Sequence, residues 1–197
     1  MSLGVDLDEL LAAVDVLSVR NGHSREGFLL DHGLRVHETC NRWTYSATPV
    51  NSLTFASTGG DGVHFGLLQI ASMSSSNGPV VMTVPAASRA NHVVAGSIAE
   101  FLGLGCAHGW FSLEQLAYRP EYALNLYADA EPPTDSSIAQ LFGYLSVKPT
   151  ALGAARLEAL ARQFAGAIVL DQQASIPKPF DREAFLAWKR SKYGDDA

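Results

Sequence analysis

Cysteine is almost absent from this chain of 197 residues, which contains only Cys40 and Cys106. The two residues are far apart, and they form neither a CxxC pair nor the dense pattern of a small disulfide-linked domain. Two isolated cysteines are typical of reduced thiols in a reducing compartment. We therefore expect both thiols to be structural or inert rather than nucleophilic.

Long apolar runs are absent as well. No stretch reaches the ~18 uninterrupted apolar residues of a transmembrane helix, and residues 1–8 lack the basic start and apolar run of a signal peptide. We therefore expect a cytoplasmic protein without membrane contact. Hydrophobic residues still make up 47% of the chain, which is typical of a globular protein. The length predicts one domain over residues 1–197, because a chain of this size buries about 70% of its extended-chain surface.

Positive charge is scarce in the middle of the chain. Residues 43–147 contain seven acidic residues but only two basic ones, Arg89 and Arg119. So few cations cannot neutralise a row of phosphates, and we expect no nucleic-acid partner. An acidic surface can attract a basic protein, although solubility alone is the simpler explanation for it.

Recognisable phosphate-binding and catalytic motifs are missing. The glycine-rich residues 57–62 lack the lysine of a P-loop and the GxGxxG spacing of a dinucleotide fold, and a strand is predicted to follow them. Residues 22–27, GHSREG, differ from the GxSxG nucleophile elbow because the second glycine comes one position too late. We therefore assign no catalytic residue.

Histidine is more common than cysteine, with six residues in the chain. Histidines at suitable spacing can bind a metal ion. His32, His37, Glu38 and Cys40 fall within nine residues, but without HExxH or CxxC spacing. Scattered histidines are more often partly buried hydrogen-bonding residues. We assign no metal site; a hydrolase or metalloenzyme using His32, His37 and Cys40 is the enzymatic alternative.

Alternating apolar residues in the centre predict a β-hairpin. Residues 50–56 place Leu53 and Phe55 on one face, and residues 63–70 do the same with Phe65 and Leu67. The turn between the two strands consists of Gly59, Gly60, Asp61 and Gly62. Its glycines can adopt the positive φ angles of a tight chain reversal.

Two more strands are predicted at residues 79–85, which prolines bound, and at residues 91–95. Ser97 and Glu100 then have the spacing of a capping box, so a helix is expected to begin there and to end near residues 105–109.

Further helices are predicted before and after the strands in the sequence. Asp6 and Glu9 precede an N-terminal apolar stripe at capping-box spacing, and Ser112 and Gln115 repeat that spacing before Pro120, which is expected to break the segment. Apolar stripes predict helices over residues 138–145, 157–168 and 181–192. Residues 21–45 have a mixed pattern and no assigned element. The order of elements favours an α+β fold, with an antiparallel sheet of several strands packed against helices and additional C-terminal helices.

Three central segments also carry a family resemblance. They are residues 55–62, FASTGGDG, the strand at residues 79–85, and residues 97–102, SIAEFL, which lead to Gly109, Trp110 and Phe111. In these segments the chain resembles the SUKH superfamily, which includes a fungal regulator of cell-wall synthesis and many bacterial immunity proteins that neutralise cognate toxins. The resemblance covers residues 48–118, with residues 121–193 as a helical C-terminal extension.

The resemblance implies an α+β fold without catalytic residues or an obligatory cofactor, and it makes the turn the mark of the fold. We therefore expect a non-enzymatic protein-binding module, an immunity protein that binds a toxin. The candidate partner-binding residues are Asp61, His64, Trp110 and Phe111, although core packing is the simpler explanation for the two aromatic residues. The alternative is a regulatory or scaffolding protein that binds a host factor or small ligand with the same fold.

Overall fold

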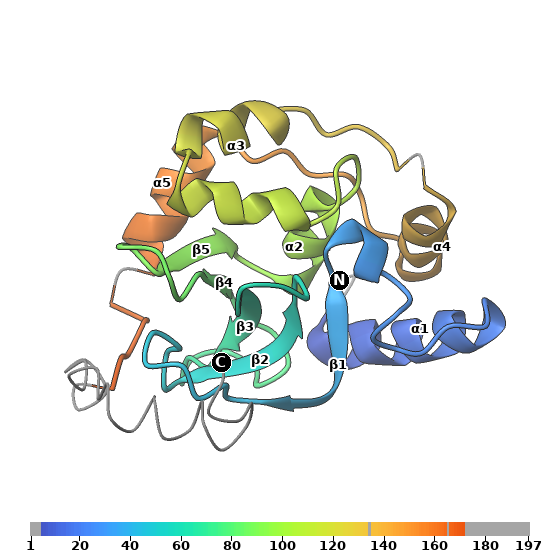
Figure 1. Cartoon of the computed structure of the whole chain (residues 1–197), viewed down its shortest axis with the longest axis horizontal. Helices are drawn as coiled ribbons and strands as arrows, with labels where there is room; N and C mark the ends of the chain where they lie inside the picture. The colour runs from blue at the N-terminus through green and yellow to red at the C-terminus, as the bar shows by residue number, and fades with distance from the viewer. Residues whose placement is uncertain (1–4, 134, 165, 172–197) are drawn as a thin grey trace, which may run out of the picture.

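A computed structural model describes residues 5–133, 135–164 and 166–171 of the chain. An α-helix and a short 3-10 helix come first, five strands follow, and the other helices come last, which is an α+β order (Figure 1). The elements are α1 (Leu7–Arg20), η1 (Leu30–His32), β1 (Arg35–Asn41), β2 (Ser52–Ser57), β3 (His64–Leu68), β4 (Val80–Thr83), β5 (Asn91–Ala95), α2 (Ile98–Leu104), η2 (Phe111–Ala117), α3 (Pro120–Leu126), α4 (Ser136–Leu145) and α5 (Ala154–Gln163). The predicted α+β class is confirmed.

The sheet is an antiparallel meander in the order β1-β2-β3-β4-β5. The hairpin β2–β3 and the strands β4 and β5 lie where the alternating pattern predicts them. Strand β1 comes from the segment that had no assigned element, and it pairs with β2 at the edge of the sheet. Its register shifts between Val36 and Asn41, so the middle of β1 bulges away from β2.

Arg25 stabilises this bulge. Its Nη1 atom donates to the carbonyl oxygens of His37, at 3.3 Å, and Glu38, at 3.2 Å. Its Nε atom bonds to Asp15 of α1 at 2.5 Å. These bonds satisfy carbonyls that the ladder leaves free, and they attach the bulge to α1.

Two neighbouring rows of residues cross all five strands. The first row is formed by Arg35, Ser57, His64, Thr83 and Asn91, which are direct cross-strand neighbours. The next row is formed by Val36, Ala56, Phe65, Met82 and His92. Direct cross-strand neighbours point to the same face of the sheet, and successive residues of a strand point to opposite faces. The polar row and the largely apolar row therefore lie on opposite faces of the sheet.

Local signals set the first two α-helices. Asp6 and Glu9 form the predicted capping box at the start of α1, with Asp6 Oδ1 accepting from the Glu9 amide at 3.0 Å. Ser97 Oγ accepts from the Glu100 amide at 3.2 Å at the start of α2. The Glu100 side chain also accepts from the Gly96 amide, at 2.6 Å, and bonds to Arg156 of α5, at 2.6 Å.

Later helices differ from the prediction in three places. Ser112 and Gln115 form no cap, because residues 111–117 are a 3-10 helix without a side-chain cap. Pro120 follows the end of η2, as expected, but it also begins α3, since a proline in the first helical turn lacks only an N–H that would have no partner there. The prediction of a helix over residues 157–168 is right in place but too long, as α5 ends at Gln163.

Helix α4 matches its prediction and begins with an Asp135 cap that accepts from the amides of Ser137, at 2.7 Å, and Ile138, at 3.4 Å. The helix predicted over residues 181–192 lies outside the described residues.

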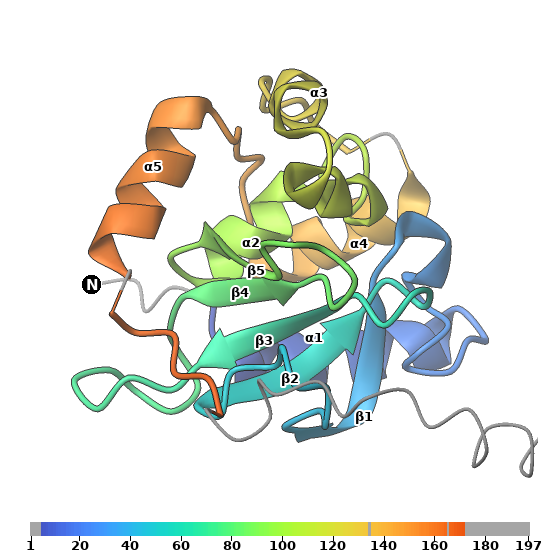
Figure 2. The same ribbon diagram turned by 60° about the vertical axis from the view of Figure 1, so that its left-hand side comes forward.

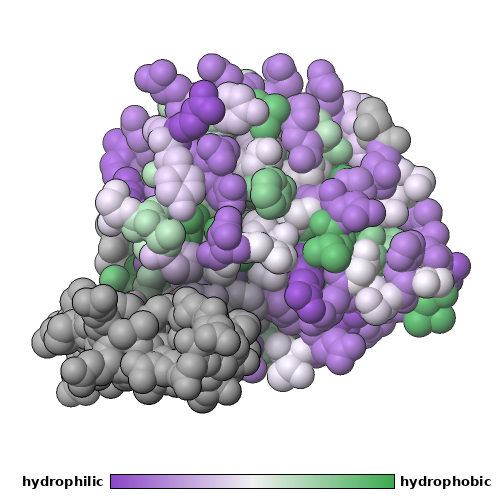
Figure 3. Space-filling view, viewed as in Figure 1, coloured by the Kyte–Doolittle hydropathy of each residue, from purple (hydrophilic) through white to green (hydrophobic). Residues whose placement is uncertain are grey.

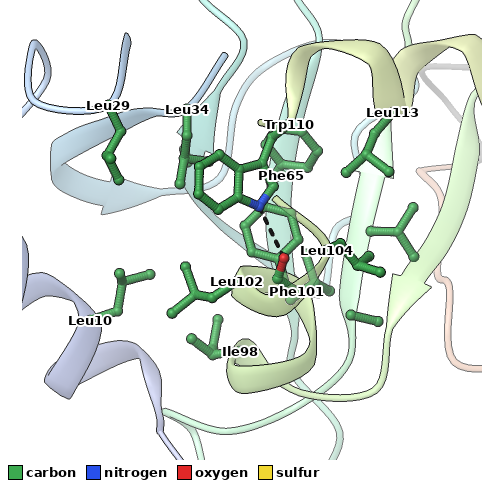
Figure 4. Close-up of a cluster of buried hydrophobic side chains, with 14 of the residues drawn as sticks. Leu10, Leu29, Leu34, Phe65, Ile98, Phe101, Leu102, Leu104, Trp110 and Leu113 are labelled. Carbon is green, nitrogen blue, oxygen red and sulfur yellow. Dashed lines mark hydrogen bonds between the residues drawn. The ribbon is translucent and has the colours of Figure 1, made fainter. Parts of the chain in front are cut away.

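The main core packs the apolar row against α1, α2 and η2. Trp110 lies at its centre, and its indole N–H donates to the carbonyl of Phe101 at 3.0 Å (Figure 4). The Phe101 ring also contacts Phe55 and Phe65 of the sheet, with centroids 5.6 and 4.9 Å apart. A smaller cluster on the opposite face joins Val81 and Val93 to Leu160 and Phe164, so α5 packs against β4 and β5 there; Figure 2 shows α5 beside these strands.

The outer surface carries little continuous apolar area on the face shown in Figure 3. Hydrophilic residues predominate there, and hydrophobic residues lie in small separate groups. Within the described ranges, no helix is both long and apolar enough to cross a bilayer.

Candidate functional site

The glycine turn between β2 and β3 is the first feature of the candidate site. Gly59, Asp61 and Gly62 have positive φ angles of 86°, 50° and 71°. The Val63 amide donates to the Gly60 carbonyl at 3.1 Å, and the Thr58 amide donates to the Val63 carbonyl at 3.1 Å. These bonds close the predicted hairpin and present Asp61 at its exposed tip.

Gly62 is favoured by its backbone angle, and the Tyr45 ring lies close to it. A Cβ atom at this position would lie 2.7 Å from the hydroxyl oxygen of Tyr45. Tyr45 belongs to the loop of residues 42–51 between β1 and β2, and its side chain is 43% exposed. The glycine therefore lets an aromatic ring lie against the turn.

His64 contacts both the turn and the loop that carries Tyr45, from the inside of the fold. Its Nδ1 lies 2.7 Å from the Gly62 carbonyl, and its Nε2 lies 3.0 Å from Thr48 Oγ1. Both contacts are satisfied if Nδ1–H donates to the carbonyl and Nε2 accepts from the hydroxyl. Burial lowers the pKa of His64, against the opposing effect of the Gly62 carbonyl. The neutral ring therefore connects the turn to the loop above it.

A pocket of about 400 Å³ opens between the turn, β1 and this loop. We call it the turn pocket. It is lined by Glu26, Arg35, His37, Trp43, Tyr45, Ser57, Val63 and the four turn residues Gly59, Gly60, Asp61 and Gly62. The polar row of the sheet places Arg35 and Ser57 side by side in its wall.

Ion pairing fixes the charge in one wall of the pocket. Arg35 Nε donates to Glu26 Oε2 at 2.8 Å, and a second bond runs from Arg35 Nη2 to the same oxygen. This bond to Arg35 lowers the pKa of Glu26. His37 Nδ1 lies 3.6 Å from Glu26 Oε1, but burial lowers the pKa of His37 and favours its neutral form.

Aromatic rings form another part of the lining. The Trp43 ring contacts two histidines, with its centroid 5.1 Å from that of His37 and 4.9 Å from that of His64. The Trp43 and Tyr45 centroids are 6.0 Å apart with a 39° angle between the rings. Contacts on this side hold the Trp43 ring in place.

An acidic and apolar surface flanks the turn. Burial raises the pKa of Glu114, and the charge of Asp61 raises it further, so the two carboxylates repel each other. Phe111 packs on Gly33 and is 52% exposed, while Leu30 packs on Gly59 and is 42% exposed. We call Leu30, Asp61, Phe111 and Glu114 the turn face.

The four predicted partner-binding residues separate into two pairs. Asp61 and Phe111 are exposed and can contact another molecule. Trp110 is 0% exposed and His64 is 1% exposed. Trp110 fills the core and His64 supports the turn from inside, so neither side chain reaches the surface.

The residues of the metal and hydrolase alternative do not meet at one point. His32 Nε2 pairs with Asp135 at 3.1 Å, whereas His37 faces Glu26. Burial raises the pKa of the Cys40 thiol. In the part of the chain that the structure describes, no group of three or more histidine, cysteine or acidic side chains could hold a metal ion.

Sequence reasoning missed Glu26, Arg35, Trp43 and Tyr45, which all precede β2. The only available signal was Val36 beside Leu34, because Val36 is the one fully buried residue of β1. A single apolar position cannot show a strand period. Comparisons of the chain with protein-family models, with curated proteins and with solved structures found no match.

Proposed function

We propose that this chain is a non-enzymatic protein-binding module, an immunity protein that neutralises a basic bacterial toxin through the turn face. The observation that carries the proposal is the pair Asp61 and Glu114 beside exposed Phe111 and Leu30. Within the described residues, neither carboxylate forms an ion pair. Two neighbouring unpaired acids destabilise each other, and a cationic partner would relieve that repulsion.

The composition of the turn face suits a protein interface. An exposed phenylalanine supplies apolar contact area, and surrounding acids give electrostatic selectivity for a basic surface. Only two basic residues lie between positions 43 and 147, so few cations of the chain itself compete with a basic partner for these acids. The SUKH resemblance supports the same role, because its hairpin signature is the turn that carries Asp61.

The contacts of His64 and Arg35 indicate a structural role for these two residues rather than a catalytic one. His64 uses both ring nitrogens in contacts with Gly62 and Thr48, and Arg35 is bonded to Glu26. A general base needs a free nitrogen or carboxylate within reach of a nucleophile. These groups instead hold the turn, the loop and β1 together.

A second candidate function is a regulatory or scaffolding protein that binds a small ligand. The turn pocket favours it, because a volume of about 400 Å³ falls within the ordinary range for small-molecule sites. In this case the pocket, and not the turn face, would be the main binding surface.

Co-expression with the product of an adjacent toxin gene tests the proposed function. The full chain is expected to restore growth and to co-purify with the toxin. The double variant Asp61→Asn/Glu114→Gln is expected to lower the affinity by about tenfold or more, as removal of paired interfacial charges does.

The matched control is Asp129→Asn/Glu131→Gln, which removes two exposed acids outside the turn face. It is expected to leave affinity within about twofold of the parent. Absence of binding to the product of any neighbouring gene would overturn the immunity role. Equal loss in both double variants would instead show that total charge acts and the turn face does not.

A further inference from the structure

The lining of the turn pocket contains two carboxylates. Asp61 carries a carboxylate at the exposed tip, and Glu26 carries a second one in the wall. Such a wall favours a ligand with several N–H donors.

Arg35 does not make the pocket a site for anions. It is the only arginine or lysine among the lining residues, and its Nε and Nη2 atoms already bond to Glu26. This ion pair cancels the two charges, and Asp61 then leaves the pocket with a negative charge. A phosphate or carboxylate ligand would meet Asp61 at the tip of the turn.

The aromatic wall suits a planar cation. The Trp43 and Tyr45 rings lie side by side, with an angle of 39° between their planes. Packing of Trp43 on His37 and His64 holds its ring before a ligand arrives, which lowers the entropy lost on binding. A cation over the face of a tryptophan or tyrosine is attracted by the ring electrons.

We propose that the turn pocket binds the guanidinium group of an arginine side chain that a protein partner inserts. The group would stack on Trp43 and Tyr45 and donate hydrogen bonds to Asp61. Arginine fits better than lysine because its planar group stacks, carries five donors and is more weakly hydrated. This inference rests on the proposed function, since the arginine belongs to the toxin that the turn face binds.

Titration of the full chain with N-acetyl-arginine amide tests the proposal without the partner. The shifts of the Trp43 indole N–H and of the Asp61 and Gly62 amides, followed by NMR, are expected to saturate with a Kd on the order of 1 mM. N-acetyl-lysine amide is expected to bind about fivefold more weakly because its ammonium group does not stack.

Two variants with matched controls locate the site. Asp61→Asn is expected to weaken arginine binding by about fivefold, and Asp129→Asn to leave it unchanged. Tyr45→Leu is expected to weaken it similarly, whereas Tyr144→Leu, which replaces a ring that is 50% exposed, is not. Tyr45 is itself 43% exposed, so its replacement is not expected to prevent folding.

Three outcomes would overturn the proposal: shifts that do not saturate, equal binding of the lysine and arginine probes, and tighter binding of inorganic phosphate. The result is independent of the toxin assay. If the chain restores growth but does not bind the arginine probe, the inference is wrong and the proposed function stands. If the probe binds at Trp43 and Asp61 but no toxin is neutralised, the pocket assignment stands and the immunity role fails.

Discussion

The two rows that cross the five strands have opposite chemistry and opposite consequences. The apolar row, with Phe65 and Met82 at its centre, is buried by direct packing, which requires no directional partners. The polar row must be covered by groups that satisfy it: Thr48 contacts His64, and the Ala47 carbonyl accepts from Asn91 at 2.9 Å. The face with the apolar row therefore supplies the main core. The face with the polar row holds the loop of residues 42–51, and the turn pocket opens beside this loop.

The largest expected effect is on the apolar face. Trp110→Ala removes a fully buried ring and the hydrogen bond to Phe101, and we expect the free energy of unfolding to fall by about 3–5 kcal/mol. Urea denaturation followed by circular dichroism measures the change.

Phe111→Ala is the neighbouring control, since this ring is 52% exposed. It is expected to change stability by no more than about 0.5 kcal/mol. If Trp110→Ala cost as little as Phe111→Ala, the apolar face would not be the main source of stability.

The next effect is at the turn on the polar face. Gly62→Ala adds a Cβ atom 2.7 Å from the Tyr45 hydroxyl at a φ of +71°, and we expect it to destabilise the fold by about 2 kcal/mol. Because the ring must move, the NMR signals of Tyr45 and Trp43 are expected to shift as well.

Gly60→Ala is the matched control for this variant. A Cβ atom at Gly60 would have nothing within 4 Å, and the residue is not among those with positive φ. It is expected to leave stability and the Tyr45 signal almost unchanged. Equal effects of the two variants would show that the turn tolerates no side chain at all and that the contact with Tyr45 is unimportant.

Features with a local signal could be predicted from the sequence. The Asp6–Glu9 capping box, the hairpin turn and the helix that begins after Ser97 each depend on residues within four positions of one another. The buried face of the hairpin was also predictable in part, because Leu53 and Phe55 alternate in one strand and Phe65 and Leu67 in the next. Asp61 and Phe111 were found for the candidate site because they lie in or beside these segments.

The pocket could not be predicted, because its walls come from long-range contacts. Strand β1 is an exposed, bulged edge strand whose carbonyls are satisfied by Arg25, so its pattern lacks a β period. Trp43 and Tyr45 lie in a loop whose position depends on Thr48 and His64 meeting in the folded chain. The aromatic pair at positions 110 and 111 shows the remaining limit, since sequence alone did not tell which ring is buried.

A pH titration separates the two faces through His64. Burial lowers its pKa below the ordinary value of 6.5, so the folded state binds fewer protons than the unfolded chain. Stability is therefore complete above pH 6.5 and falls as the pH decreases below it. His64→Gln is expected to lose about 1 kcal/mol at pH 7.5, through its contacts with Thr48 and Gly62, and to show a shallower decrease down to pH 5.5.

The exposed His108 supplies the control for that titration. His108→Gln is expected to keep both the stability at pH 7.5 and the slope of the parent. Part of the slope remains in His64→Gln, because burial lowers the pKa of His37 and His92 too. A slope identical to that of the parent would assign the pH dependence to groups other than His64.

The smallest expected effect has the opposite sign. Burial and the charge of Asp61 raise the pKa of Glu114, so its contribution to stability is complete below its ordinary value of 4.5 and is lost as the pH rises. Glu114→Gln is therefore expected to stabilise the fold at pH 7 by no more than about 0.5 kcal/mol, and to have no effect at pH 3.5, where the carboxyl is already protonated. Urea denaturation at both pH values measures this, with Asp129→Asn as the control. Stabilisation at pH 7 together with weaker toxin binding would place function at the turn face. Destabilisation at pH 7 would show that Glu114 is a structural residue and would remove it from the turn face.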